Sequence, residues 1–242
     1  MHKIWYIAGK DLASFFDSLI AYILLVVFLG LSGFFTWWYG TDVFMRGQAD
    51  LSAFFNIAYW TLFFFIPALT MRSLAEERRS GTLELLLTKA VSEWQVVAGK
   101  FLATLVLITI ALAASLPYYF TIIRIGEVDH GAIWCGYLAL MLMSSAYAGI
   151  GIFASSLTGN QIVAFLVALL IGSVFHLVLQ IMAPNFTGMV GAVLDQLSTS
   201  VHFDSMSRGV IDSRDVLYFL SLTFVGLVLA EMNLSERGVR GR

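Results

Sequence analysis

The longest uncharged stretch of the chain runs from His130 to Leu194 and contains no Asp, Glu, Lys or Arg. A soluble domain carries about 25% charged residues, whereas this chain has 12%, together with 59% hydrophobic residues. So few charged side chains cannot cover a surface that faces water, and the composition predicts an integral membrane protein. With one cysteine, Cys135, the chain can form neither an internal disulfide nor a cysteine-based metal site.

The uncharged runs predict six transmembrane helices, because most of them reach the roughly 20 residues that a crossing requires. The stretch from His130 to Leu194 is too long for one helix, and the polar turn of residues 155–161 divides it into two. We therefore expect an all-α integral membrane protein with a single domain over residues 1–242. The expected spans are about 18–39, 51–71, 97–123, 132–154, 161–183 and 214–233.

The sixth span is the shortest, because only residues 216–230 are uncharged. They cover about 22 Å at the rise of an α-helix, against a hydrocarbon core of roughly 30 Å. The prediction therefore requires the flanking charged side chains to lie at the interfaces or to snorkel towards them. These side chains are Arg214, Asp215 and Glu231.

Two further segments are amphipathic and do not reach across a membrane. Residues 2–17 have apolar side chains at roughly helical spacing, which predicts a helix in the membrane interface. The alternative is an ordinary extension of the first span. Residues 185–213 alternate charged and apolar positions, and we expect one or two short helices on the opposite membrane surface.

Positive charge sets the expected topology. If the first loop lies outside, ten Lys and Arg residues fall inside and four fall outside, which obeys the positive-inside rule. This arrangement places both termini in the cytoplasm and requires an even number of spans. The four outer residues are Arg46, Arg124, Arg208 and Arg214.

The charged loop of residues 72–96 separates the second span from the third. Ser73 to Glu76 and Ser92 to Gln95 each fit a capping box, which predicts two helix starts. Gly81 lies where a helix can end and the chain can bend. A short helix over residues 82–88 is then expected between two turns. Its leucines, at 83, 85, 86 and 87, argue against a freely solvated loop and favour packing against the bundle or a partner.

Other candidate sites are sparse. His176 is an ionisable group in the middle of a span, which is either functional or a structural hydrogen-bonding group. Small residues in the fourth span allow close helix approach, either within the chain or at a pore or dimer seam. No protease motif is present, and Gly99-Lys100 lacks the other residues of a nucleotide-binding loop.

The loop sequence EERRSGTLELLLTKAVSEWQVVAGK resembles the first cytoplasmic loop of ABC-2 type transporter permeases. The resemblance continues in SSLTGNQIVAF and HFDSMSRGVIDSRDVLYF, which are similar to the permease of the gliding-motility-associated ABC system. One departure is Ala90, where relatives often have Pro, and this leaves the exit angle of the short helix open.

The resemblance implies an ABC-2 transmembrane domain whose residues 81–88 form a coupling helix docked on a separate ATPase subunit. The implied interface residues are Glu76, Glu77, Arg78, Gly81, Thr82, Leu83, Glu84, Leu85, Leu86 and Thr88. ATP and Mg would be bound by that partner, and this chain would hold no cofactor and no metal. The resemblance further implies a second permease copy, a companion membrane subunit with a periplasmic domain, and a location in the bacterial inner membrane. No nucleic acid is expected.

Three functions stay open at this point. The chain is a transporter half that moves a hydrophobic cargo, a mechanical transducer that moves a periplasmic partner, or a membrane anchor without an ATPase. On the outer surface, the candidate residues for a partner or cargo are Asp204, Arg208, Asp212 and Arg214. Arg208 and Asp212 are four residues apart and are expected to pair if this part is helical.

Overall fold

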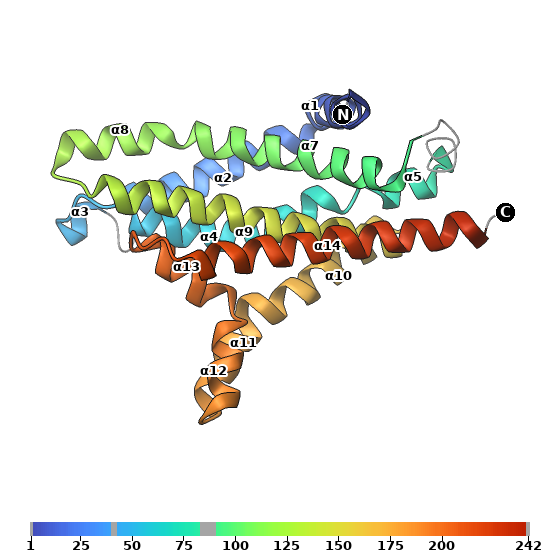
Figure 1. The fold of residues 1–242 in the computed structure, drawn as a ribbon. Coiled ribbons are helices and arrows are strands. Elements are labelled where there is room, and N and C mark those ends of the chain that lie inside the picture. Colours follow the sequence, from blue (N-terminus) through green and yellow to red (C-terminus); the bar gives the residue numbers. More distant parts are fainter. Residues whose placement is uncertain (1, 40–42, 83–90, 241–242) are drawn as a thin grey trace.

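The computed structural model describes residues 2–39, 43–82 and 91–240, and within these ranges every regular element is a helix (Figure 1). Six helical stretches are long and apolar enough to cross a membrane. This confirms the prediction of an all-helical membrane protein with six spans. The stretches are Leu19–Trp37 (α2), Ser52–Arg79 (α4 and α5), Glu93–Ile125 (α7 and α8), His130–Leu157 (α9), Gln161–Asn185 (α10 to η2) and Ser213–Glu236 in α14.

The helices α4 (Ser52–Thr70), α7 (Glu93–Ala114), α9 and α14 (Ser213–Arg240) run side by side along the long direction of the bundle (Figure 1). One end of the bundle carries α5 (Ala75–Arg79) and is called the α5 end below. The other carries α3 (Val43–Arg46) and α13 (Thr199–Ser207) and is called the α13 end. The first helix, α1 (His2–Asp17), packs on α7 and is seen nearly end-on in Figure 1, so it runs across the bundle.

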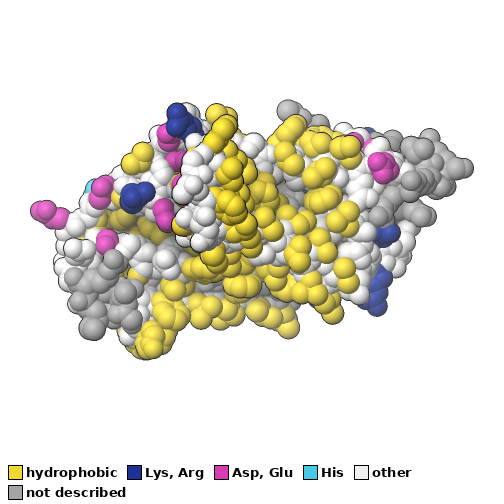
Figure 2. All heavy atoms as spheres, turned by 90° about the horizontal axis from the view of Figure 1, so that it is seen from below, with side chains coloured by type: hydrophobic (Ala, Val, Ile, Leu, Met, Phe, Trp, Pro, Cys, Tyr) yellow, Lys and Arg dark blue, Asp and Glu magenta, His cyan; other side chains and the backbone are white. Residues whose placement is uncertain are grey.

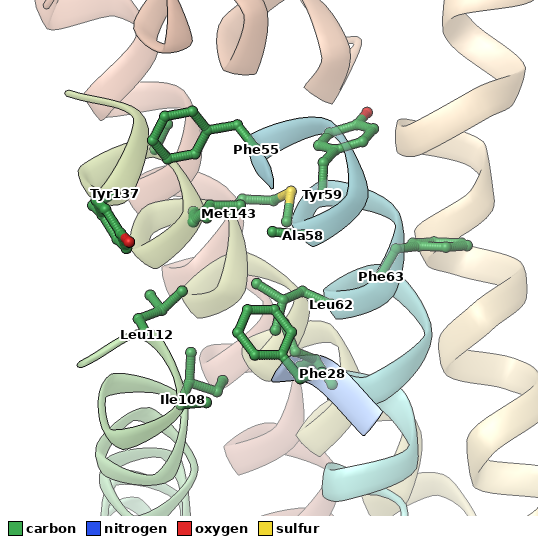
Figure 3. Packing of buried hydrophobic residues seen from close by; sticks show 14 of the residues in the cluster. Phe28, Phe55, Ala58, Tyr59, Leu62, Phe63, Ile108, Leu112, Tyr137 and Met143 are labelled. Carbon is green, nitrogen blue, oxygen red and sulfur yellow. The ribbon is translucent and has the colours of Figure 1, made fainter. Parts of the chain in front are cut away.

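The helix α4 forms the centre of the apolar core. It is apolar on almost all sides, and a helix of this kind is stabilised by being surrounded rather than by having one buried face. Phe54, Leu62 and Ile66 on α4 are each 0% exposed. Figure 3 shows Phe28 of α2 and Ile108 of α7 in the same cluster as the α4 side chains.

Small residues allow α9 to approach α14 and α4 closely. A Cβ placed on Gly226 of α14 would lie 2.6 Å from the backbone carbon of Gly149 on α9, and one on Gly149 would lie 2.8 Å from the Thr223 carbonyl oxygen. Gly151 packs against Thr70 of α4 in the same way. The small residues predicted in this span, Ala146, Gly149, Gly151, Ala154 and Ser155, are all buried and pack within the chain.

The fifth span is interrupted. It consists of α10 (Gln161–Ser173), a π-helical turn η1 (Val174–Val178), α11 (Leu179–Met182) and a 3-10 turn η2 (Ala183–Asn185). Together with α12 (Met189–Gln196), its last part projects away from the bundle (Figure 1). Figure 2 shows hydrophobic side chains over the middle of the molecule and charged side chains gathered towards its ends, as a membrane-spanning surface requires.

One local prediction is wrong, and two charged residues of the predicted spans are buried. The capping box at Ser73 is wrong, because α5 begins after Leu74 and has no side-chain cap. Lys100, which the predicted third span includes, lies inside α7 and is buried. Asp215, predicted at a membrane interface, is also buried. Both charged side chains are buried because residues distant in the sequence pair with them, as described below.

Candidate functional site

An ion-pair cluster lies at the α5 end, where α1, α5 and α7 meet. Lys100 Nζ donates to Asp11 Oδ2 at 3.0 Å and lies 2.9 Å from Glu77 Oε1. Lys10 lies 3.5 Å from the same Glu77 oxygen. The Lys100 side chain is 3% exposed, whereas that of Lys10 is 56% exposed. A buried ammonium group requires close anionic partners, and here α1 and α5 each supply one.

A second set of contacts joins the base of the charged loop to α9. The backbone N–H groups of Leu74 and Ala75 both donate to Ser155 Oγ at 3.0 Å, and Ser155 Oγ donates to the carbonyl of Met71. These N–H groups open α5 and have no partner inside that helix, so Ser155 takes the place of a helix cap. The loop base is therefore fixed to the fourth span as well as to α1 and α7.

The loop leaves this base through Gly81, whose φ of +71° is in the left-handed region. This confirms the predicted bend, because a side chain at that dihedral angle is strained. Arg78 Nη1 donates to the carbonyl of Leu157 at 3.0 Å, across to the connection between α9 and α10. At the other side of the loop, Ser92 and Gln95 form the predicted capping box that starts α7.

The predicted ATPase-interface residues fall into three groups according to where the structure places them. Glu76, Arg78, Gly81 and Thr82 are exposed at the α5 end. Glu77 faces inwards onto Lys100, so its carboxylate binds within the chain instead of facing a partner. The remaining predicted residues lie outside the described residues; they are Leu83, Glu84, Leu85, Leu86 and Thr88.

At the α13 end, the four predicted residues do not form one cluster. Arg208 Nε donates to the backbone carbonyl of Asp204 at 3.0 Å. Asp212 Oδ1 accepts from the backbone N–H of Arg214 at 3.0 Å, and so it caps the start of α14. The expected pair of Arg208 with Asp212 is not among the ion pairs of the described residues, because α13 ends at Ser207 and the helical spacing is lost. Partial burial raises the pKa of the Asp204 carboxyl above its ordinary value. The nearby Arg208 acts in the opposite direction, but its effect is the smaller one.

Sequence reasoning missed the pair of His202 and Asp215. His202 Nδ1 lies 2.7 Å from Asp215 Oδ1, and His202 Nε2 lies 2.8 Å from the carbonyl oxygen of Gln196. The pair joins α13 to the first turn of α14 and to the last residue of α12. Positions 202 and 215 are not related by a helical spacing. The one signal in the sequence was that the uncharged part of the sixth span is too short to cross the membrane, so that the span has to include Asp215.

The third candidate, His176, is enclosed by aromatic rings. Its ring stacks between Tyr59 and Phe63, at centroid distances of 4.0 and 4.2 Å, and its Nδ1 is hydrogen-bonded to the Tyr147 hydroxyl at 2.8 Å. It lies in the π-helical turn η1, and such turns frequently mark functional positions. These contacts fix the fifth span to α4 and α9, as expected of a structural histidine.

The arrangement at the α5 end is suited to transmitting motion. Among the described residues, no group of three or more His, Cys, Asp or Glu side chains could hold a metal ion. The charged loop is instead tied to α7 and α9 through buried polar contacts, and Lys100 of α7 links it to Asp11 of α1. A displacement of the loop would therefore move α1, α7 and α9 together.

Residues 45–199 match the family described as ABC-2 family transporter protein, which is well over half of the chain. The matched segment includes the charged loop, its contacts on α9 and the interrupted fifth span. No curated protein matches the chain. Permeases of this family have no nucleotide-binding site and no cofactor of their own, and they pair with ABC ATPase subunits. The chain therefore belongs to the ABC-2 transporter family and is the membrane permease component of such a transporter.

Proposed function

We propose that the charged loop of residues 72–96 is the docking site for the ATPase subunit and that it transmits ATP-driven motion to the spans. The observation that carries this proposal is the attachment of the loop base. Glu77 is held by Lys100 of α7, and the start of α5 is held by Ser155 of α9. A loop that served only as a connection would not require buried polar contacts to both α7 and α9.

The contacts support transmission because they are short and buried. Packed side chains and buried ion pairs transmit displacement with little slack, because interiors are dense and have low compressibility. The Lys100 ammonium group shares its charge between Asp11 and Glu77, so α1 and α5 are restrained by the same side chain. A push on the exposed surface of α5 therefore reaches α1 through Lys100 of α7.

We further propose that the α5 end faces the cytoplasm and that both termini lie there, in a bacterial inner membrane. The excess of Lys and Arg at this end supports the orientation, since cytoplasmic loops retain positive charge. The amphipathic α1 runs across the bundle, as a helix lying in the cytoplasmic interface would.

The assembly that we propose contains two ATPase subunits, a second copy of this permease and a companion membrane subunit with a periplasmic domain, in a gliding-motility-type system. The resemblance of HFDSMSRGVIDSRDVLYF to that type of permease supports the assignment. The output is export of a cargo or, in the alternative form, motion passed to the periplasmic partner. Stimulation of ATP hydrolysis by lipids or glycans in nanodiscs is expected only for the form that moves cargo.

Recovery of the ATPase with the tagged permease tests the docking site. Gly81→Pro forces φ to about −65°, where the native value is +71°, and Glu84→Lys reverses the charge of the implied coupling helix. Both variants are expected to reach the membrane and to lose most of the co-purified ATPase. Arg208→Glu, at the α13 end, is the matched control and should retain it. Wild-type subunit ratios in both loop variants would refute the docking site.

A further inference from the structure

Two amide side chains are exposed within the membrane-spanning stretches. Asn56 lies on α4 in the second span, and Gln180 lies on α11 in the fifth. Both side chains are exposed, and neither is hydrogen-bonded to another residue that the structure describes. Acyl chains form no hydrogen bonds, so polar side chains within spans usually bind a neighbouring helix. The two amides therefore indicate a surface that lipid chains alone do not cover.

The two amides lie at a similar level of the bundle. The rings of His176 and Trp60 meet edge to face with centroids 4.8 Å apart, and this contact aligns the fifth span with α4. The two spans run in opposite directions, because α4 ends and α10 begins at the α5 end. Asn56 is four residues before Trp60, and Gln180 is four residues after His176. Each amide is therefore about one helical turn nearer the α13 end than the ring contact.

The exposed side of α4 is a single stripe. Its exposed residues are Ser52, Asn56, Trp60 and Phe64, which follow one another at a spacing of four and so share one face of the helix. The helices α2, α9 and α10 pack against the other sides. An amide within an otherwise aromatic stripe is typical of a contact between membrane helices, where it supplies hydrogen bonds and fixes the register.

A second copy of this chain is the neighbour that fits these side chains. An amide both donates and accepts hydrogen bonds, so amides related by a two-fold axis can satisfy one another. Such a contact needs no opposite charge, and neither the stripe of α4 nor α11 carries a charged residue. The same contact would cover the apolar side chains exposed beside Gln180, which are Val178 and Ile181.

We propose that Asn56, Trp60 and Phe64 of α4, together with Gln180 of α11, form the surface on which two copies of the permease meet. This surface is called the amide face below. The amides of the two copies pair across a two-fold axis within the membrane. The inference rests on the second permease copy of the proposed assembly and names the surface that it occupies, and it does not depend on the ATPase docking site.

Cross-linking between two differently tagged copies tests the amide face. Both copies are expressed together in a Cys135→Ala background, one with Asn56→Cys and the other with Gln180→Cys, and a membrane-permeant bifunctional thiol reagent is added to the membranes. We expect a cross-linked product that carries both tags. The matched control combines Asn56→Cys with Leu217→Cys on α14, which should give none. Leu217 is 63% exposed and, like Asn56, lies four residues after the first residue of its helix.

Recovery of one tag with the other measures the pairing itself. Asn56→Leu combined with Gln180→Leu should weaken pairing by roughly tenfold, because the hydrogen bonds between the copies are lost. Asn56→Gln, which retains an amide, should pair as the wild type does. Recovery of the ATPase subunit should be unchanged in all these variants.

The outcomes separate the amide face from the assembly as a whole. Copies that are recovered together but do not cross-link between positions 56 and 180 would place a cargo or a lipid head group on this surface, and would overturn the proposal alone. Undiminished pairing of the double leucine variant would also overturn it. Failure to recover the second tag with the wild type would overturn both the amide face and the proposed second copy.

Discussion

Glu77, near the start of the charged loop, and Lys100, just after its end, form an ion pair of 2.9 Å in which the lysine side chain is 3% exposed. Through this pair the entry and the exit of the loop are joined. Asp11 of α1 contacts the same ammonium group. The loop is therefore closed at its base.

Replacing Lys100 by Met should strongly destabilise the permease, because it leaves Asp11 and Glu77 largely buried without their central cation. Removing one partner of a buried pair costs about 3–5 kcal/mol, which corresponds to a fall of roughly 10 °C in the midpoint of thermal unfolding. Lys10→Met is the matched control, since Lys10 is 56% exposed and contacts the same Glu77 oxygen. Its midpoint should change little, and an equal loss in both variants would contradict the assignment.

Close packing of α9 on α14 gives a second prediction. Gly226→Ala places a Cβ 2.6 Å from the backbone of Gly149, which α9 cannot accommodate without moving. We expect a loss of about 1–3 kcal/mol in the free energy of unfolding. Gly30→Ala on α2 is the control, because a Cβ there meets no atom within 4 Å. Thermal unfolding of the purified variants measures the difference, and equal midpoints for Gly226→Ala and the wild type would refute the packing.

Much of this fold was predictable from the sequence, because uncharged runs determine the spans and local side chains determine the helix start at Ser92 and the bend at Gly81. The burial of charged residues inside the bundle was not predictable. Lys100 has its partners at positions 11 and 77, and Asp215 has its partner at position 202. Hydropathy and helical spacing carry no information on partners so far apart in the sequence, so the burial of these charged side chains could not be predicted.

Of the candidate sites, the fold explains the role of some residues and not others. The role of Asp212 is explained by its immediate neighbours in the sequence, because its carboxylate caps the start of α14. The predicted pair of Arg208 and Asp212 fails, because the helix ends between them. The π-helical turn at His176 was not predicted, and its ring stacks on Tyr59 and Phe63, which come from another span. Contacts of that kind leave no periodic signal in the sequence.

Asp204 provides a test of pH dependence at the α13 end. Burial raises the pKa of its carboxyl, with Arg208 acting in the opposite direction. The folded state therefore retains the proton to higher pH than the unfolded state, and stability falls as pH rises through the interval between the two pKa values. Asp204→Asn should be at least as stable as the wild type at neutral pH, and the difference should vanish in acid.

The measurement is the unfolding midpoint of both proteins as a function of pH. Asp195→Asn, on the exposed surface of α12, serves as the control. A wild type that is more stable than Asp204→Asn at neutral pH would show that the bond network around Arg208 outweighs the effect of burial.

Labelling from the two sides of the membrane tests the proposed orientation. In a Cys135→Ala background, a cysteine at Met189 should react with an impermeant reagent in intact cells, whereas one at Arg79 should react only after permeabilisation. Both positions are exposed, so differences in burial do not explain the contrast. Reaction at position 79 in intact cells would reverse the topology.

Cross-linking from the loop to the ATPase tests the central claim most directly. Thr82 follows α5 in the charged loop, and its side chain is exposed. In the assembled complex, a photo-activated cross-linker on Thr82→Cys should capture the ATPase subunit, and the same reagent on Met189→Cys at the α13 end should not. Failure of position 82 to capture the ATPase in a complex that still hydrolyses ATP, or capture from position 189, would contradict docking at the charged loop.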